Sequence, residues 1–454
     1  MRRNGRQWVQ TLKTSDRATA GLHQRGEWEA RVAGAEPDLK TLCSALGADS
    51  EPAQLLSEPS LAPSLAPIFE TAYRRTAWPV HLPPGNDIEL VLDEGELRCG
   101  DAREPICEVE CELKAGMPAA LFDLARQLQD AVPLRIGNVG KAARGYGLLA
   151  PQAPSAVKAH AVELHTGMTV EQGVQAIAGN CLAQMQANEP GVIAGNDAES
   201  VHQMRVGMRR LRSLLRLFAR EMPLPQALQA ELDWLTGELG AARDADVLAD
   251  STLPRVVQAC AEEAALASLQ QAAAVQAAAK RQLAAAAVAG VRYARLMLDL
   301  VSWVHAARWR ETLGEPGQAR LAEPLAERAA KILERRHKRL LQRGAHLLDG
   351  TPEQRHRARI AAKKARYATE FFQSLLPQER AKRYVRRLSA LQDVLGAMND
   401  AAVADGLLRE MVHARPELDG AAGFTRGWLA GRRDTDLREL APLWKELAAM
   451  KAPR

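Results

Sequence analysis

The sequence predicts an α+β protein with more than one domain, in which an antiparallel β region precedes an all-α region made of helical bundles. The chain has 454 residues, more than a single hydrophobic core usually fills. Apolar and polar residues alternate through residues 1–115, whereas from about residue 157 the apolar positions recur every three to four residues. We therefore expect two domains, at residues 1–150 and 157–450.

Five segments of the N-terminal region have strand patterns, separated by Gly, Pro and Asp turn signals. They are QWVQTLK, GEWEARV, ETAYRRTAW, IELVLDEGELRCG and ICEVECELKAG. Alternation in the last segment places Glu108, Glu110 and Glu112 on one face, opposite the cysteines and valine between them. The pattern therefore predicts a strand that presents a row of acids to one side.

A helical period begins at MPAALFDLARQLQDAV, and GLLAPQAPSAVK is typical of a linker. Beyond the linker, Ala, Leu, Arg and Glu recur at helical spacing, and residues 261–289 are rich in alanine, the best helix former. Breakers divide this region into helices of bundle length at GEPGQ, DGTPEQ and SLLPQER. The C-terminal region is therefore predicted to be all-α.

The segment VHQMRVGMRRLRSLLRLF predicts a helix with one basic face. Basic residues at offsets 0, 3, 7 and 10 fall within about 80° of the helix circumference, and leucines occupy the other side. The row consists of His202, Arg205, Arg209 and Arg212, with Arg210 beside it and Arg216 extending it. One face is therefore charged, while the opposite face can pack into a core.

The same construction recurs in RHRARIAAKKARYATEFF, 154 residues later. The second row consists of His356, Arg359, Lys363 and Arg366, with Lys364 in the position of Arg210. Further along the chain, LGAMNDAAV resembles LGAARDADV, so that Asp400 matches Asp244. The helical region is therefore internally duplicated.

A single basic row is usually a solvated helix face, and the net charge of +5 is modest. Like charges one turn apart destabilise a helix by roughly a few tenths of a kcal/mol per pair, so a duplicated row indicates that an anion neutralises it. The histidine at the head of each row could donate from both ring nitrogens when protonated, or equally cap or pack the helix.

Such rows favour a ligand with many regularly spaced negative charges, because arginine and lysine bind phosphate oxygens well. Inorganic polyphosphate and nucleic acid both have this property. Single-stranded nucleic acid normally requires aromatic stacking platforms, but only 4% of the residues are aromatic and the basic rows contain none. No turn and recognition helix for duplex DNA is visible. Polyphosphate is therefore the favoured partner, and nucleic acid the less favoured one.

At these residues the sequence resembles the CHAD family over roughly residues 160–445, through both H-x-x-R-[VI]-x-x-[RK]-[RK]-x-R cores and the later L-G-x-x-[RN]-D segments. Members of that family consist of two related helical bundles that bind inorganic polyphosphate in a basic pore or groove. The resemblance implies polyphosphate contacts from His202, Arg205, Arg209, Arg210, Arg212, His356, Arg359, Lys363, Lys364 and Arg366. It implies no cofactor for the helical region.

The N-terminal region resembles the CYTH, or triphosphate tunnel, family in LHQRGEWE, ELVLDEGELRCG, EVECELKAG and KAARGYGLL. Members of that family are closed antiparallel β-barrels that hydrolyse triphosphates with a divalent metal, here Mg²⁺ or Mn²⁺. The resemblance implies metal binding by Glu27, Glu29, Glu108, Glu110 and Glu112. It implies triphosphate binding by Lys13, Arg25, Arg74 and Lys114.

The sequence departs from the CYTH pattern in one respect, since that family begins with an E-x-E-x-K strand and no such strand precedes QWVQTLK here. We therefore expect an incomplete triphosphate tunnel, with an open sheet edge and an incomplete metal site. Little or no hydrolysis by this chain follows from that expectation, and no catalytic residue is assigned.

The favoured function is binding of inorganic polyphosphate through the two basic, histidine-headed helices. The alternative is a metal-dependent inorganic triphosphatase whose helical domain recruits substrate, and a third class is a helical scaffold for acidic partners. With no run of about twenty apolar residues, we expect no membrane span and a cytoplasmic protein, associated with polyphosphate-containing granules.

Overall fold

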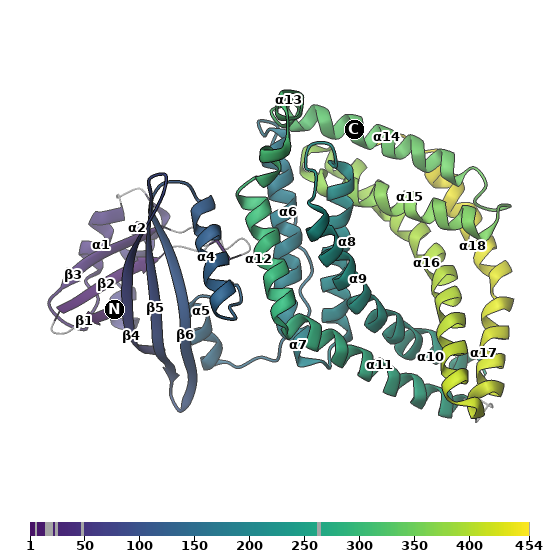
Figure 1. The fold of residues 1–454 in the computed structure, drawn as a ribbon, viewed down its shortest axis with the longest axis horizontal. Helices are drawn as coiled ribbons and strands as arrows, with labels where there is room; N and C mark the ends of the chain where they lie inside the picture. Colours follow the sequence, from purple (N-terminus) through teal and green to yellow (C-terminus); the bar gives the residue numbers. More distant parts are fainter. Residues whose placement is uncertain (5–6, 14–20, 23–25, 47–49, 261–264, 454) are drawn as a thin grey trace. The chain divides into compact units, whose positions relative to one another are not determined.

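The computed structural model describes the whole chain except residues 5–6, 14–20, 23–25, 47–49, 261–264 and 454. The chain forms two compact units, which Figure 1 draws as ribbons. Unit 1 comprises Met1–Leu121 and Ile136–Ala153, and unit 2 comprises Phe122–Arg135 and Pro154–Arg454. None of the helices in the described ranges is both long and apolar enough to cross a membrane.

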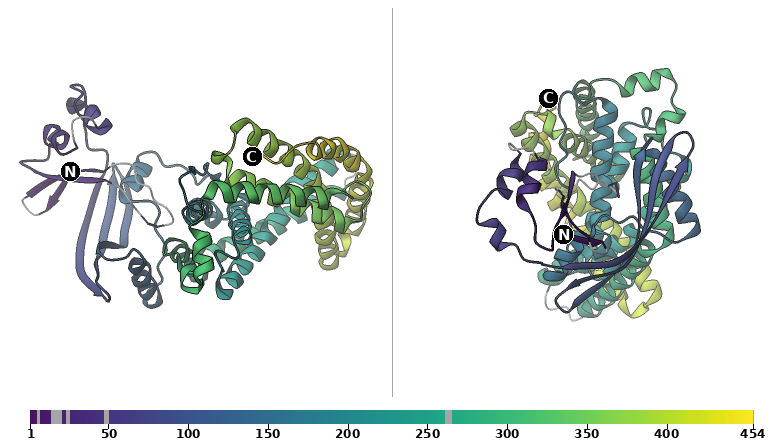
Figure 2. Two further views of the ribbon diagram at one scale, coloured as in Figure 1. Left: turned by 90° about the horizontal axis from the view of Figure 1, so that it is seen from above. Right: turned by 90° about the vertical axis from the view of Figure 1, so that its left-hand side faces the viewer.

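Unit 1 contains two antiparallel sheets of three strands each. The first sheet has the order β1 (Arg2–Asn4), β2 (Gln7–Lys13) and β3 (Glu27–Val32), and the second has the order β4 (Glu70–Leu82), β5 (Asn86–Cys99) and β6 (Ala102–Ala115). The predicted antiparallel β region is therefore confirmed, and within the described residues it does not close into a barrel. The second sheet is long and twisted (Figure 2).

Short helices accompany the sheets of unit 1. They are α1 (Leu39–Leu46), α2 (Glu51–Leu56), α3 (Leu61–Ser64) and α5 (Lys141–Leu149). Helix α5 packs against β4, β5 and β6. Gly145 permits this close approach, because a Cβ at that position would lie 2.3 Å from the ring of Phe69.

In β6, acidic side chains lie on the covered face of the sheet, where an ordinary half-buried strand has apolar side chains. The acids Glu104, Glu108 and Glu110 share the face that holds the buried Ile106 and interacts with α5. Val109, on the other face, is 38% exposed. Of the predicted row of acids, Glu108 and Glu110 thus lie on the side of β6 that contacts α5, whereas the side chain of Glu112 is 64% exposed.

Unit 2 is helical, as predicted. Its helices up to the second basic row are α4 (Ala119–Ala131, from residue 122), α6 (Val170–Ala187), α7 (Glu189–Ala194), α8 (Ala198–Leu217), α9 (Gln226–Val247), α10 (Leu253–Ala259), α11 (Ala265–Ala289), α12 (Val291–His305), α13 (Glu315–Leu321) and α14 (Leu325–Gly344). The remaining helices are α15 (Pro352–Phe371), α16 (Gln378–Ala414), α17 (Asp419–Gly431) and α18 (Arg433–Ala448). A π-helical segment (Leu248–Thr252) joins α9 to α10, and short 3₁₀ turns occur at Arg308–Thr312, Gln373–Leu375 and Pro416–Leu418.

Side-chain caps fix where both basic helices begin. The Asp197 carboxylate accepts from the backbone N–H of Glu199 at the start of α8. Thr351 and Gln354 form a reciprocal capping box at the start of α15. These caps stabilise the first turn of each helix, and the second lies within the predicted breaker DGTPEQ.

Helix α16 belongs to two separate hydrophobic clusters. Its first half contributes Leu388 and Leu391 to a cluster with α14, α15 and α18. Its second half contributes Leu408 and Met411 to a cluster with α9, α10, α11 and α17. With 37 residues it is about 55 Å long, longer than the bundle-length helices that the breakers predict.

Candidate functional site

The basic faces of α8 and α15 meet in unit 2, where the two helices pack together. Burial lowers the pKa of Arg359 on α15, and the charge of Arg209 on α8 lowers it further. Lys363 is affected by burial and by Arg359, Arg209 and Arg205, all of which lower its pKa. We call Arg205, Arg209, Arg359 and Lys363 the four-cation cluster.

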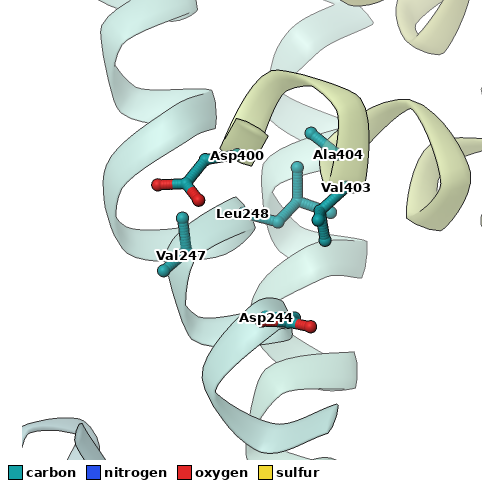
Figure 3. Close-up of a pocket in the computed structure, with 6 residues that line it drawn as sticks. All are labelled: Asp244, Val247, Leu248, Asp400, Val403 and Ala404. Carbon is teal, nitrogen blue, oxygen red and sulfur yellow. The ribbon is translucent and has the colours of Figure 1, made fainter. Parts of the chain in front are cut away.

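Two aspartates at equivalent positions of the internal repeat lie near this cluster, Asp244 on α9 and Asp400 on α16. Figure 3 shows both aspartates among the residues that line the pocket between them. The Oδ1 of Asp244 lies 3.7 Å from the Nη2 of Arg205. Burial raises the pKa of Asp244, Arg205 opposes this shift, and the charge of Asp400 adds to it. The cavity between the aspartates measures only about 10 Å³, room for a single water.

The cluster retains donors that the protein does not use. The Nη2 of Arg359 donates to the Oδ1 of Asn399 at 2.6 Å, but the Nε of Arg359 and the Nε of Arg209 are buried without a hydrogen-bond partner among the described residues. Gly240 leaves room for Arg205, since a Cβ there would lie 2.7 Å from its Nη1. Buried donors without partners are costly, and an anion would satisfy them.

The pKa of Lys363 is lowered to about 7, first by burial and then by neighbouring arginines, with Asp400 opposing. A bound polyanion would stabilise the charged amine, so its binding near neutral pH would take up a proton. We therefore expect affinity for long polyphosphate to fall roughly tenfold as the pH rises from about 6 to about 8. Titrations across this range would measure the slope.

The control for this prediction is Lys363→Arg, because arginine stays charged throughout the range. That variant should bind with a flatter pH profile, while Lys338→Arg on α14 should leave the slope unchanged. An unaltered slope in Lys363→Arg would assign the titration to another group.

Arg210, one of the polyphosphate contacts that the resemblance implies, has its partners within the protein. It is 6% exposed, and its guanidinium donates to the Oε1 of Gln184 and the Oδ1 of Asn180, each at 2.8 Å. Its positive charge also lies over the ring of Phe371. Arg210 therefore holds α8 against α6 and α15.

Arg212 and Arg366 also have partners within the protein. Arg212 donates to Thr236 and pairs with Asp233, both at 2.6 Å. Arg366 lies 3.7 Å from Glu370 and 3.5 Å from Ser389. Arg212 and Arg366, at the ends of the two predicted basic rows, therefore take part in the packing of their helical bundles.

The two histidines differ from each other. Burial lowers the pKa of His202 to about 4, and the nearby Arg243 contributes. His202 is therefore neutral near pH 7, so that one ring nitrogen donates and the other accepts. His356 is exposed. Two further predicted contacts, Lys364 and Arg216, lie near each other and near α14.

Unit 1 contains a second charged site, on the covered face of β5 and β6. The carboxylate oxygens of Asp93, Glu108 and Glu110 all lie within 4.8 Å of one another. Asp93 is fully buried, and it faces Glu108 in the register of the two strands. We call these residues the carboxylate triad.

Three cations hold the triad together. The Nζ of Lys141 on α5 lies 2.8 Å from Asp93 and 2.9 Å from Glu110, and it contacts Glu108. Arg75 on β4 donates to both oxygens of Asp93, at 2.8 and 2.6 Å, and to Glu110 at 2.9 Å. Arg144 donates to Glu108 at 2.7 Å.

The pKa shifts follow from these contacts. Burial alone would lower the pKa of Lys141, but its hydrogen bonds to the three carboxylates raise it well above the usual value. Burial alone would raise the pKa of Asp93, but Arg75 and Lys141 lower it. Asp93 and Lys141 therefore remain ionised at neutral pH, within a site where acids and bases are interleaved.

The residues present fit a divalent metal ion with an oxygen preference. Three carboxylate oxygens from two strands can converge on one ion, and Mg²⁺ and Mn²⁺ favour carboxylate ligands. The buried Asp93 is held in place by Arg75, so one ligand of such an ion is already oriented.

The other residues predicted for this site lie elsewhere. Glu27 pairs with Lys13 at 3.0 Å and Glu29 with Arg2 at 3.1 Å, all in the first sheet. Arg74 pairs with Glu94. Lys114 pairs with Glu112 and Glu89, outside the triad. The remaining prediction, Arg25, lies outside the described residues.

Sequence reasoning missed Asp93, Arg75, Lys141 and Arg144. Asp93 and Arg75 sit opposite each other in the register of β4 and β5, a pairing that alternation alone does not reveal. Lys141 and Arg144 are three residues apart on α5, so helical spacing within KAARGYGLL was a usable signal.

The comparisons with known proteins agree with this division of the chain. The CHAD domain model matches residues 176–409, just over half of the chain, and the CYTH domain model matches residues 1–146. An inorganic triphosphatase of Haemophilus influenzae is 32% identical over 146 residues, which cover 32% of this chain and 39% of that protein. The chain thus matches well under half the length of this relative.

Among solved structures, the crystal structure of the CHAD domain from the plant Ricinus communis matches with 39% identity and a TM-score of 0.60. The match covers 66% of this chain and 99% of the plant domain. The protein therefore belongs to the CHAD domain family and carries a CYTH domain at its N-terminus.

Proposed function

We propose that the protein is a metal-dependent inorganic triphosphatase whose helical unit binds condensed phosphate. The observation that carries the proposal is the carboxylate triad interleaved with Lys141, Arg75 and Arg144. Such a site offers ligands for a cation and donors for phosphate oxygens on one covered face. The similarity to the inorganic triphosphatase supports the same substrate class.

The chain's own residues have two roles in this proposal. Asp93, Glu108 and Glu110 would hold Mg²⁺ or Mn²⁺, which supplies neutralisation of phosphate charge when bound. Lys141 and Arg75 exchange their carboxylate partners for phosphate oxygens as substrate enters. Because the carboxylates and the phosphate oxygens are both anionic, Lys141 and Arg75 stay charged throughout the exchange. They orient the triphosphate by charge-assisted hydrogen bonds.

This proposal revises the sequence expectation of little hydrolysis. That expectation rests on the E-x-E-x-K strand with which the CYTH family begins, whereas the triad is supplied entirely by β5 and β6. These strands pair along their whole length, so the three carboxylates keep their places without a further strand.

We expect Mn²⁺-dependent phosphate release from tripolyphosphate, and a loss of roughly tenfold or more in Glu110→Gln, because removing one metal ligand weakens the site. The matched control is Glu94→Gln, since Glu94 pairs with the exposed Arg74. It should keep near-normal activity. Absence of metal-dependent release from the unmodified chain, or equal losses in both variants, would contradict the assignment.

We also propose that unit 2 binds inorganic polyphosphate at the four-cation cluster. The meeting of both basic rows beside buried arginine donors without partners supports this second function. A linear chain of phosphates can contact α8 and α15 together. Delivery of such chains to unit 1 would unite the two proposed activities.

A further inference from the structure

A second group of cations lies between α14 and α15, apart from the four-cation cluster. On α14, Arg336, Arg339 and Arg343 follow offsets of 0, 3 and 7, which place them on one face of the helix. Facing them on α15 are Arg357 and Lys364. Together with Ile360 and Ala361 these residues line a groove of about 310 Å³, which we call the α14–α15 groove.

The groove is distinct because neighbouring lysines on α15 point in different directions. Lys363 is surrounded by Arg359 and Arg209, whereas the charges nearest Lys364 belong to Arg336, Arg216 and Arg339. Consecutive helical residues are about 100° apart. The helix α15 thus carries one basic face toward α8 and another toward α14.

The cations of the groove are not balanced by the protein. Among the described residues, none of the five forms an ion pair with a carboxylate, whereas about half of the other arginines of the same unit do so. Arg336 is only 8% exposed, and its Nε is buried without a hydrogen-bond partner. Burial and the charges of Arg335 and Arg339 lower its pKa.

A solvated charged face does not account for Arg336. Lys331 and Lys338, on the opposite side of α14, are exposed to solvent, as are Arg339, Arg343 and Arg357 of the groove. In contrast, Arg336 is desolvated among like charges, which is costly unless an anion compensates for it. The neighbouring α15 adds two more cations to the same groove.

We propose that the α14–α15 groove binds a short chain of condensed phosphates, either inorganic or carried by a nucleotide. Its volume is at the small end of the range for small-molecule sites, which suits two or three phosphates. Guanidinium groups from two helices supply forked donors for phosphate oxygens. Ile360, 38% exposed, and Ala361 provide an apolar surface beside them. This site is independent of both activities proposed above.

The test is chemical modification of arginines in the full chain with an arginine-selective dicarbonyl reagent, with a chelator present and peptide mass spectrometry as the readout. Tripolyphosphate and ATP are the two probes. We expect either probe to slow modification of Arg339, Arg343 and Arg357 by at least about threefold. Arg335, which lies outside the groove, should react at an unchanged rate.

Variants separate this site from the others. Protection should persist in Arg209→Glu with Lys363→Glu, which disrupts the four-cation cluster. It should be lost in Lys364→Glu, and it should remain in Lys331→Glu with Lys338→Glu on the opposite face of α14. Protection that disappears together with the four-cation cluster would mean a single extended site and would overturn the proposal.

The probes also distinguish the source of the phosphates. Stronger protection by ATP, reduced specifically by Ile360→Asp, would identify a nucleotide; stronger protection by tripolyphosphate, insensitive to Ile360→Asp, would identify an inorganic chain. Either result supports the site. Equal modification of Arg339, Arg343 and Arg335 with and without both probes would eliminate it.

Discussion

Replacing Arg205 and Arg209 by glutamate should weaken the binding of long polyphosphate by about a hundredfold or more. Charge-assisted hydrogen bonds contribute roughly 1.5–3 kcal/mol each, and charge reversal adds repulsion to their loss. The equivalent change on α15, Arg359→Glu with Lys363→Glu, should have a similar effect. Titration of size-defined polyphosphate at fixed salt would measure both.

The combination of the two double variants tests whether the rows form one site. Arg359 and Lys363 lie within electrostatic range of Arg209, so the loss in the quadruple variant should be smaller than the product of the separate losses. Strictly multiplicative losses would indicate two independent sites.

Two controls accompany this experiment. Lys331→Glu with Lys338→Glu makes the same change in net charge on the solvated side of α14, and it should cost less than about threefold, mostly through long-range electrostatics. Single-stranded DNA of matched charge tests the other polyanion. DNA that displaces polyphosphate at equal charge concentration would favour a nucleic-acid ligand. Full binding by the quadruple variant would mean that both basic rows are ordinary solvated helix faces.

Replacing Arg210 by methionine should destabilise unit 2 by about 3 kcal/mol, because one partner of a buried charged network is lost. Asn180 and Gln184 would each lose their donor. Burial already raises the pKa of Glu370, while Arg366 and Arg210 lower it, so the substitution would leave this carboxyl with weaker compensation. Urea unfolding followed by far-ultraviolet circular dichroism would detect the change.

The adjacent Arg209→Met provides the matched comparison. Arg209 lies among like charges, so its removal should cost under about 1 kcal/mol of stability while weakening polyphosphate binding. Arg210→Met should show the reverse, with near-normal affinity of the folded protein. Equal stability losses in the two variants would contradict the assignment of Arg210 to helix packing.

These neighbouring arginines show what the sequence could predict in unit 2. Helical periodicity and the internal repeat were sufficient to predict both basic helices and their equivalence in the repeat. They could not separate Arg210 from Arg209, because the partners of Arg210 come from α6. Burial of a charged side chain depends on such distant polar groups, which no local pattern contains.

In unit 1, prediction from the sequence was limited by different features. Alternation correctly placed Glu108 and Glu110 on one face of β6, but it could not show that this face would be covered by α5. Of the adjacent Arg74 and Arg75, only Arg75 reaches the triad. The choice between them depends on the register with β5, which is a property of the folded sheet.

Helix α16 has a consequence for how the duplicated helical region can be handled and how it can evolve. Since one continuous helix completes both hydrophobic clusters, no cut within it yields two self-sufficient repeats. Each half produced alone would expose apolar side chains that normally contact the other. We therefore expect the duplicated region to unfold as one cooperative unit. Asp400 lies where α16 leaves one hydrophobic cluster and enters the other.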